Sequence, residues 1–279
     1  MKLHECVILV GGQGTRLRSV VQDIPKPMAD INGKPFLEYL LSFLNAQGCK
    51  HVVLSVGYKH EIIENYFGNQ YLNLKIDYAV EKEPLGTGGG IKNSIGYISQ
   101  DDFFLLNGDS FFDVNLAELA EFHVLRKSLV TLSVKEMHHV DRYGTLSIED
   151  GKIISFNEKQ PIEKGFINTG VYVVSKQVFE KAAILQENAS ENTHVIAGLT
   201  RNLPQITPLT NGLRVKPAMT ESPTEKFSFE KDILEANVSK LPFYAFQSDG
   251  YFIDIGIPED YKKAQADFIS RFSLQHPIF

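Results

Sequence analysis

The stretch that decides the fold is Cys6-Val7-Ile8-Leu9-Val10-Gly11-Gly12-Gln13-Gly14-Thr15-Arg16-Leu17, near the start of the chain. Its first five residues form a continuous apolar run, which predicts a central parallel strand buried on both faces. The glycines that follow let backbone N–H groups approach phosphate oxygens, and Arg16 adds a forked, permanently charged donor. The stretch therefore predicts a strand that ends in an anion-binding loop. A tight strand-to-helix turn with a surface arginine is the alternative interpretation.

Alternating strand-like and helix-like stretches continue through the first half of the chain. Strands are expected at 51–56, 74–79 and 103–106, and helices at 35–46, 60–66 and 88–98. Repeated strand–helix–strand units predict a Rossmann-like α/β fold, with a mostly parallel central sheet and helices on both faces. Ligands bind such sheets at the carboxyl ends of the strands, which nominates residues 11–16, 81–90 and 107–110.

The second half of the chain changes character. Strands are expected at 129–134, 144–148, 152–156, 166–174 and 251–256, with few helices before a last one at 258–272. This pattern predicts a small antiparallel lid over the parallel half, able to hold a second substrate. Residues 188–224 are rich in Thr, Asn and Pro, and their apolar residues follow no sustained helical or strand period. We therefore expect an inserted surface segment without a catalytic role. A substrate or oligomer loop is the alternative, since long loops are often functional.

Composition excludes several classes of protein. The 279 residues carry a net charge of −6, from 28 Lys and Arg against 34 Asp and Glu. This balance argues against a nucleic-acid or membrane-surface partner, and the longest apolar runs are too short to span a membrane. Cys6 and Cys49 can form no disulfide framework, and the first residues lack the layout of a signal peptide. We therefore expect a cytoplasmic protein.

A second motif completes a resemblance to a known family. The segment Ile24-Pro25-Lys26-Pro27-Met28 holds a lysine between two prolines, whose fixed φ angles preorganise the loop. Together with the Gly11–Leu17 loop, it resembles the signature of the sugar-phosphate nucleotidyltransferases, a Gly-Gly-x-Gly-Thr-Arg-Leu loop followed by Pro-Lys-Pro-Met. Later motifs agree with the family in order over nearly the whole chain outside 188–224. The resemblance implies an enzyme that joins a nucleoside triphosphate to a sugar 1-phosphate and releases pyrophosphate.

The resemblance also implies a role for each motif. Arg16 and Lys26 would be catalytic and act on the triphosphate. The nucleotide-binding positions would be Leu9, Gly11, Gly12, Gly14, Thr15, Glu81, Pro84, Gly86, Thr87, Asn107 and Gly108. Asp109 and Asp254 would hold Mg²⁺, which takes one or two carboxylates and completes its shell with phosphates and water. The sugar phosphate would be bound by Gly144, Glu158, Lys159, Asn168 and Thr169.

Several of these positions also have purely structural interpretations. Thr87 could be a helix N-cap, Asp109 a turn aspartate and Asn168 a strand-edge amide. Asp249 and Asp260 are weaker alternatives for the second metal-binding carboxylate, as a turn residue and a first-turn acid of a helix. The order of the motifs along the chain favours the family over these interpretations.

The implied reaction needs no general base, because the attacking phosphate oxygen is already anionic at neutral pH. Catalysis would consist of positioning and electrostatic stabilisation of the phosphates. The resemblance implies one domain over 1–279, with a nucleotide-binding half at 1–125 and a sugar and metal half at 126–187 and 225–279. Homo-oligomer formation is left open.

Within the family, the runs Asp23–Met28 and Asn32–Glu38 most resemble guanylyltransferases that act on D-glycero-α-D-manno-heptose 1-phosphate. The runs Glu83–Gly89, Asp141–Thr145 and Tyr251–Gly256 also fit that subgroup. This implies GTP and a bacterial surface-polysaccharide pathway. Mannose-1-phosphate guanylyltransferases and hexose-1-phosphate thymidylyl- or uridylyltransferases are the alternatives within the family. A metal-dependent glycosyltransferase and a non-catalytic nucleotide-sugar sensor are alternatives of other classes.

Overall fold

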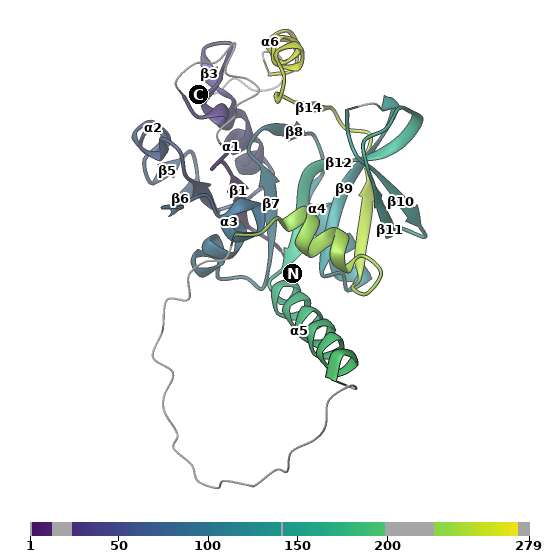
Figure 1. Ribbon diagram of the computed structural model, residues 1–279. Coiled ribbons are helices and arrows are strands. Elements are labelled where there is room, and N and C mark those ends of the chain that lie inside the picture. The colour runs from purple at the N-terminus through teal and green to yellow at the C-terminus, as the bar shows by residue number, and fades with distance from the viewer. Residues whose placement is uncertain (1, 13–23, 141, 199–225, 273–279) are drawn as a thin grey trace, which may run out of the picture.

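The computed structural model describes residues 2–12, 24–140, 142–198 and 226–272. The larger strands are β1 (Glu5–Leu9), β4 (His51–Val56), β5 (Gln70–Tyr71), β6 (Leu74–Val80), β7 (Asp102–Asn107), β9 (Val130–Val140), β10 (Thr145–Glu149), β11 (Lys152–Asn157), β12 (Ile162–Ser175) and β13 (Phe243–Gln247). They form a ten-stranded sheet in the order β10-β11-β13-β9-β12-β7-β1-β4-β6-β5, which runs through the molecule (Figure 1). Two small sheets pair β2 (Asp30–Ile31) with β3 (Lys34–Pro35) and β8 (Ser110–Phe112) with β14 (Phe252–Asp254).

Helices cover both faces of the sheet. The α-helices are α1 (Phe36–Ala46), α2 (His60–Phe67), α3 (Gly86–Ser94), α4 (Leu116–Arg126), α5 (Gln177–Gly198) and α6 (Pro258–Phe272). Short 3₁₀ turns occupy η2 (Lys26–Met28) and η3 (Ile95–Tyr97), and η4 (Phe229–Glu235) is a π-type turn. None of the described helices combines the length and the apolar composition needed to cross a membrane.

The central strand β1 is buried on both faces, as its apolar run predicts. Cys6 and Ile8 point into a core that also contains side chains of α1, α2, α4 and α6. Val7 points to the opposite side, into a second core built with α3, α5 and η4. The prediction of helices on both faces of the sheet is thereby confirmed.

Four strands of the first half are parallel neighbours as expected, but the sheet as a whole is mixed and not mostly parallel. The reason is that the antiparallel half has a different place from the one expected. β7, β1, β4 and β6 are parallel neighbours. β12 then pairs antiparallel with β7 and β9, so the second half extends the same sheet and does not form a separate layer above it. The physical reason is that β7 would otherwise present an edge of unpaired backbone groups. β10 pairs with both β11 and β12, which curls the far end of the sheet.

Sequence patterns did not predict several elements, among them α4, α5, η4 and β13. Helix α5 is anchored in the core by Val178 and Ala182 and continues to Gly198. The expectation of an unstructured segment from residue 188 is therefore wrong for residues 188–198. The sequence of residues 188–198 has no sustained apolar period, which is the signal that the prediction of a helix depends on. The remainder of that segment, 199–224, lies outside the described residues.

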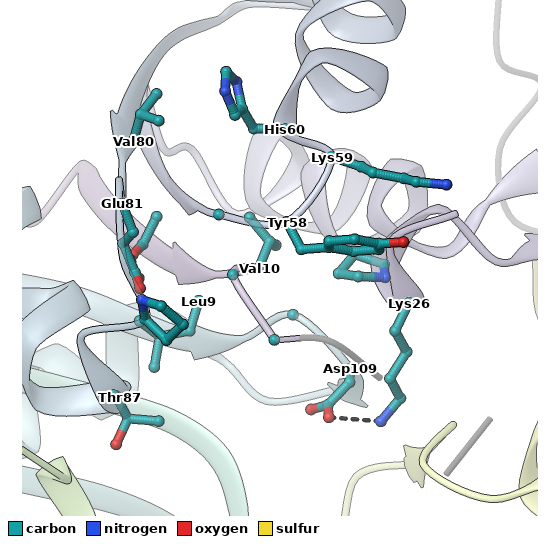
Figure 2. Close-up of a pocket in the computed structure, with 18 of the residues that line it drawn as sticks. Leu9, Val10, Lys26, Tyr58, Lys59, His60, Val80, Glu81, Thr87 and Asp109 are labelled. Carbon is teal, nitrogen blue, oxygen red and sulfur yellow. Dashed lines mark hydrogen bonds and ion pairs between the residues drawn. The ribbon is translucent and has the colours of Figure 1, made fainter. Parts of the chain in front are cut away.

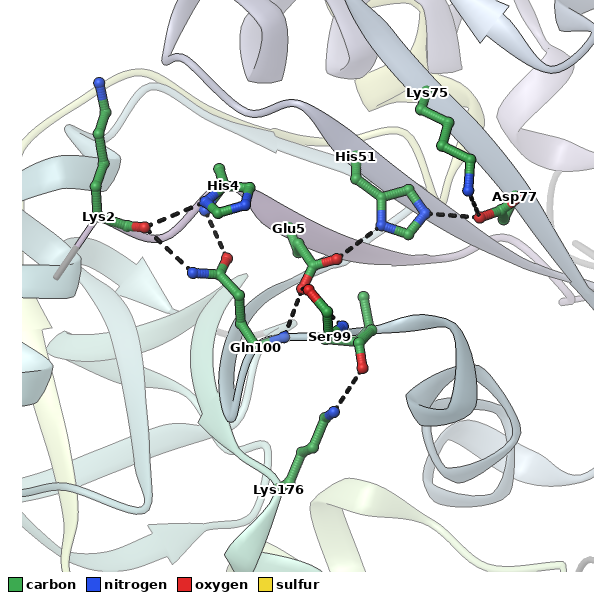
Figure 3. Close-up of polar contacts among 10 residues, drawn as sticks. Lys2, His4, Glu5, His51, Lys75, Asp77, Ser99, Gln100 and Lys176 are labelled. Carbon is green, nitrogen blue, oxygen red and sulfur yellow. Dashed lines mark hydrogen bonds and ion pairs between the residues drawn. The ribbon is translucent and has the colours of Figure 1, made fainter.

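A network of polar side chains joins three parallel strands at their amino-terminal ends (Figure 3). The Glu5 carboxylate, with 4% of the residue exposed, accepts backbone N–H groups of Ser99 and Gln100 at 2.8 and 2.6 Å. The His51 ring lies between Glu5 and Asp77, at 2.9 Å from each. Burial by itself raises the pKa of Glu5, but the hydrogen bonds, that of His51 first, hold the net pKa below its ordinary value.

This network makes part of the protein's stability depend on pH. Because the folded state lowers the pKa of Glu5, its contribution is complete above the unfolded carboxyl pKa, about 4.3, and declines as the pH falls below it. We expect Glu5→Gln to lower the free energy of unfolding by about 1.5–3 kcal/mol at pH 7. The difference should shrink below about pH 4, as measured by urea unfolding at both pH values. Glu121→Gln, at an exposed position of α4, is the matched control. A difference independent of pH would contradict this account.

Candidate active site

A cleft of about 1110 Å³ opens at the carboxyl ends of the parallel strands. The predicted residues that line it are Leu9, Gly11, Gly12, Lys26, Glu81, Pro84, Gly86, Thr87, Asn107, Gly108 and Asp109. Figure 2 shows Glu81 and Thr87 on one side of the cleft and the contact between Lys26 and Asp109 on the other. The structure thus brings together three loops that were predicted from the positions of the strand ends. The predicted residues Gly14, Thr15 and Arg16 lie outside the described residues.

The loop after β7 lies directly against the end of β1. The Gly108 N–H donates to the Leu9 carbonyl at 2.9 Å, and a β-carbon on Gly108 would lie 2.5 Å from that oxygen. Glycine is therefore the residue that permits this approach. The close contact carries Asp109, the next residue, into the cleft beside the glycine-rich loop.

Three charged side chains from distant parts of the chain meet at this point. The Lys26 ammonium lies 2.6 Å from Asp109 Oδ2 and 3.7 Å from Asp254 Oδ1, with only 10% of the Lys26 side chain exposed. Lys26 opens η2, and its prolines fix the turn as the sequence predicts. Asp254 arrives through the small sheet, in which it pairs with Ser110, the residue after Asp109. The Asp109 carbonyl also accepts the Ile255 N–H at 2.9 Å.

Among the described residues, the two carboxylates carry more negative charge than the Lys26 ammonium balances. Burial first, and then the nearby charge of Asp109, raise the pKa of Asp254. Lys26 and the Gly256 N–H, which donates to Asp254 Oδ1 at 2.7 Å, act in the opposite direction. A site of this kind favours an additional cation.

The chemistry of the donors indicates which cation would fit. Two carboxylates suit a hard divalent ion that takes its remaining ligands from water and substrate oxygens. Within the described residues, no group of three His, Cys, Asp or Glu side chains lies close enough to form a complete protein cage. The alternative Asp260 forms an ion pair with Arg142 at 3.1 Å, so Asp254 is the better second ligand.

Glu81 forms part of the wall of the cleft at the end of β6. Its Oε1 accepts the Ser55 hydroxyl and its Oε2 accepts the Leu85 N–H, each at 3.1 Å. Its carboxylate also lies close to Gly11, where a β-carbon would be 3.1 Å from Oε1. Glu81 therefore presents a fixed acceptor group between the loops that follow β1 and β6.

The structure changes the interpretation of Thr87. Its hydroxyl donates to Glu230 Oε2 at 2.6 Å and accepts the Phe229 N–H at 2.9 Å. The N-cap of α3 is Leu85, without a side-chain cap, so the N-cap interpretation of Thr87 is wrong. Thr87 lines the cleft, but its hydroxyl is occupied by contacts with η4.

The predicted sugar-phosphate residues lie on or next to three paired strands, β10, β11 and β12. Thr145 of β10 pairs with Asn157 of β11 and with Ile167 of β12. The residues next to these three in the sequence therefore lie close together. The residues brought together in this way are Gly144, Glu158, Lys159 and Asn168, and Glu158 and Lys159 are exposed. Their roles remain predictions.

Thr169 is a partial exception. With 1% of the residue exposed, its hydroxyl donates to the Ser133 carbonyl at 2.9 Å, so a sugar contact through the side chain is excluded. Asn168 is also engaged internally, because its amide donates to the Tyr172 hydroxyl at 2.7 Å and its oxygen accepts the Gly170 N–H at 3.0 Å. The register of β12 and β9 shifts between Asn168 and Tyr172, so Thr169 lies within a bulge.

Tyr143, just before β10, lies near the two carboxylates. Its ring lies edge-on to Phe252 with centroids 5.8 Å apart, two residues before Asp254. Burial first, and then the charges of Asp254 and Asp260, raise the pKa of Tyr143 to about 12. The phenol is therefore neutral at physiological pH and keeps its proton for donation.

Sequence reasoning missed several residues that line the cleft. Tyr58, Lys59 and His60 follow β4, and the rule that ligands bind at strand ends could have identified them. Lys59 has a left-handed φ of 54°, and its ammonium lies 5.4 Å from the centre of the Tyr58 ring. Glu230 of η4 and Lys226, three residues before η4, also line the cleft. No sequence pattern had predicted a structural element there.

Comparisons with known proteins agree with this geometry. The family model described as nucleotidyl transferase matches residues 5–271. The D-glycero-α-D-manno-heptose 1-phosphate guanylyltransferase of Aneurinibacillus thermoaerophilus is 43% identical over 98% of this chain and 100% of its own. The protein of the same name from Campylobacter jejuni is 41% identical over 92% of this chain and 96% of its own. The crystal structure of HddC from Yersinia pseudotuberculosis, complexed with GMP-PN, superposes with a TM-score of 0.72 at 38% identity, over 95% of this chain and 100% of that one.

The charge balance around Lys26 predicts how the site responds to a cation. Lys26→Met leaves Asp109 and Asp254 facing each other without the ammonium, so we expect the free energy of unfolding to fall by about 1–2 kcal/mol. Millimolar Mg²⁺ should restore most of this loss by binding the freed carboxylates, as measured by urea unfolding with and without the ion. Adding Asp254→Asn to the variant should reduce both the loss and the rescue. An equal loss with and without Mg²⁺ would show that the pair does not hold a cation.

Proposed function

The chain belongs to the nucleotidyl transferase family, and on this basis we propose that it is a guanylyltransferase that joins GTP to D-glycero-α-D-manno-heptose 1-phosphate. The products are a GDP-sugar and pyrophosphate. The observation that carries the proposal is the meeting of Lys26, Asp109 and Asp254 in a cleft lined by glycine-rich backbone. Such a cluster suits a reaction between two anions.

The reaction is a displacement at phosphorus. An oxygen of the sugar phosphate forms a bond to the α-phosphorus of GTP, the bond between the α- and β-phosphates breaks, and pyrophosphate leaves. The nucleophile already carries its negative charge, so the protein's task is to position both anions and balance their charge. Lys26 supplies an ammonium for the triphosphate, and Asp109 and Asp254 would hold Mg²⁺. When bound, the ion would neutralise phosphate charge. We also assign Arg16 to the triphosphate, by the resemblance of its loop.

Glu81 supports guanine as the base. Guanine presents a ring N–H and a 2-amino group next to each other, and a carboxylate accepts both. Ser55 and Leu85 each use one lone pair of Glu81, which leaves acceptor capacity on both oxygens. Adenine has neither of these donors. The GMP-PN in the related HddC structure supports the same choice of base.

The heptose rests on the relatives and on the sugar-side strands. Two relatives above 40% identity carry the heptose 1-phosphate name. We assign Glu158 to sugar hydroxyls and Lys159 to the sugar phosphate. Both residues follow β11, whose neighbour β10 pairs with β12. β12 reaches the cleft, since it pairs with β7 and its Thr169 carbonyl accepts the Ser110 hydroxyl at 3.2 Å. Mannose 1-phosphate is the second candidate substrate.

We further propose one catalytic domain, with a nucleotide half at 1–125 and a sugar and metal half at 126–187 and 225–279. The continuous pairing of β12 with β7 supports this arrangement, because both halves share one sheet. A cytoplasmic location is supported by Cys6 and Cys49, which are free and buried. Retention of the charged cluster argues against a non-catalytic sensor.

A substrate panel tests the proposed function. We expect pyrophosphate release to be fastest with GTP and D-glycero-α-D-manno-heptose 1-phosphate, among four nucleoside triphosphates and the heptose, mannose and glucose 1-phosphates. Inosine triphosphate, which lacks the 2-amino group, should have a kcat/KM lower by about tenfold, the value of one hydrogen bond to a charged acceptor. No product with any pair would favour the sensor. A preference for mannose 1-phosphate would correct the sugar.

Turnover of carboxylate variants tests the metal assignment. Asp109→Asn and Asp254→Asn should each lower kcat by about a hundredfold or more at saturating substrates, because phosphate charge would be left unbalanced. Asp113→Asn, at an exposed position on the loop after β8, is the control and should keep the wild-type rate. Near wild-type turnover of Asp109→Asn would remove Asp109 from the mechanism.

A further inference from the structure

Residues 226–230, called the strap below, cross the amino-terminal end of α3. The Phe227 N–H donates to the Leu85 carbonyl at 3.1 Å, and the Phe227 carbonyl accepts the Gly88 N–H at 3.0 Å. These two bonds fasten the backbone of the strap to residues 85–88. The loop at the cleft is therefore held by a segment that comes from the opposite half of the chain.

The fit between strap and loop explains a glycine. Gly86 has a φ of +72°, and a β-carbon there would lie 2.5 Å from the Phe227 carbonyl oxygen. A side chain at this position would be strained by the backbone and would also collide with the strap. Gly86 thus serves the contact with the strap in addition to lining the cleft.

A short side-chain hydrogen bond reinforces the backbone pairing. The Thr87 hydroxyl donates to Glu230 Oε2 at 2.6 Å and accepts the Phe229 N–H at 2.9 Å. The Ser228 hydroxyl donates to the same Glu230 oxygen at 3.1 Å. Hydrogen bonds to an ionised acceptor are stronger than neutral ones, so this is the firmest single contact between strap and loop.

The strap has its own anchor in the core. Phe229 is fully buried, as are Ile233 and Leu234 on the same turn. Phe229 packs at 6.0 Å from Tyr172 of β12, edge to face. Because these apolar contacts hold η4, the Glu230 carboxylate is not required to keep the segment folded.

The other side of the loop is held by Glu81, whose Oε2 accepts the Leu85 N–H. Residues 85–88 are therefore fixed between the carboxylate of Glu81 and the strap. Glu81 is the group assigned above to the base of the nucleotide. Any movement of the loop away from the strap changes the space between Glu81 and the opposite wall of the cleft.

We propose that the strap positions the nucleobase loop, and that Glu230 is a positioning residue for the nucleotide that acts through Thr87. This proposal rests on the proposed function, because the position of the loop affects GTP only if the base is bound beside Glu81. The strap acts on the binding of GTP and on base selectivity, and leaves the sugar phosphate and the chemical step to other residues. Base recognition thus depends on a contact between residues 143 positions apart in the sequence.

Steady-state kinetics of the full chain tests the proposal. Glu230→Ala should raise KM for GTP by about tenfold and reduce the preference for GTP over inosine triphosphate, since a charge-assisted hydrogen bond is lost. KM for the sugar phosphate and kcat should stay within about twofold. Glu230→Gln, which keeps an acceptor oxygen, should recover most of the affinity. Thr87→Val should match Glu230→Ala, and the double variant should lose little more, because the two residues form one unit.

Controls separate positioning from folding. Glu235→Ala, exposed at the end of η4, should leave KM for GTP unchanged. Additive effects of Thr87→Val and Glu230→Ala, or a Glu230→Ala variant with a wild-type KM for GTP, would overturn the proposal. So would equal losses in every kinetic parameter together with a lower Tm.

Calorimetric titration with GTP and Mg²⁺ distinguishes this proposal from the proposed function. If the wild-type chain binds GTP but transfers no GMP group to any sugar phosphate, the proposed function fails. The Kd of Glu230→Ala relative to wild type then still decides the role of the strap, with a weakening of about tenfold expected. Absence of GTP binding by the wild-type chain would overturn both.

Discussion

Two carboxylates and one ammonium group impose the constraint on which this molecule depends. Asp109 and Asp254 come from distant parts of the chain, and Lys26 lies within ion-pair distance of both. Like charges so close together require compensation, which Lys26 supplies in part and a divalent cation would complete. The sheet, the Gly108 contact and the small β8–β14 sheet all serve to hold these groups at the carboxyl ends of the parallel strands.

The two ends of the parallel sheet are built for different purposes. At the amino-terminal ends, Glu5, His51 and Asp77 satisfy one another across three strands, and burial there is matched by hydrogen bonds. At the carboxyl ends, burial first and then the nearby charge of Asp109 raise the pKa of Asp254, against the effect of Lys26. Stability is therefore concentrated at one edge, and the capacity to bind anions and cations at the other.

The first half of the chain does not form the cleft alone. β12 pairs with β7 and brings the strands of the second half beside Asp109, while β14 supplies Asp254. The strap adds a third contribution by pairing with residues 85–88. Each of these contacts joins the second half of the chain to the first, so we expect both substrates to meet where the two halves come together.

The sequence by itself determined the local chemistry: a buried strand with a glycine-rich loop, a lysine fixed between prolines, and the alternation that yields a parallel sheet. These features are encoded within a few residues by periodicity and by the backbone limits of glycine and proline. Tertiary structure alone decided that Thr87 is engaged by Glu230, that the Thr169 side chain is buried, and that the antiparallel strands extend the sheet. The physical reason is that pairing across a sheet edge, a bulge and a long-range hydrogen bond depend on which distant segments become neighbours. No local pattern of residue types records that choice.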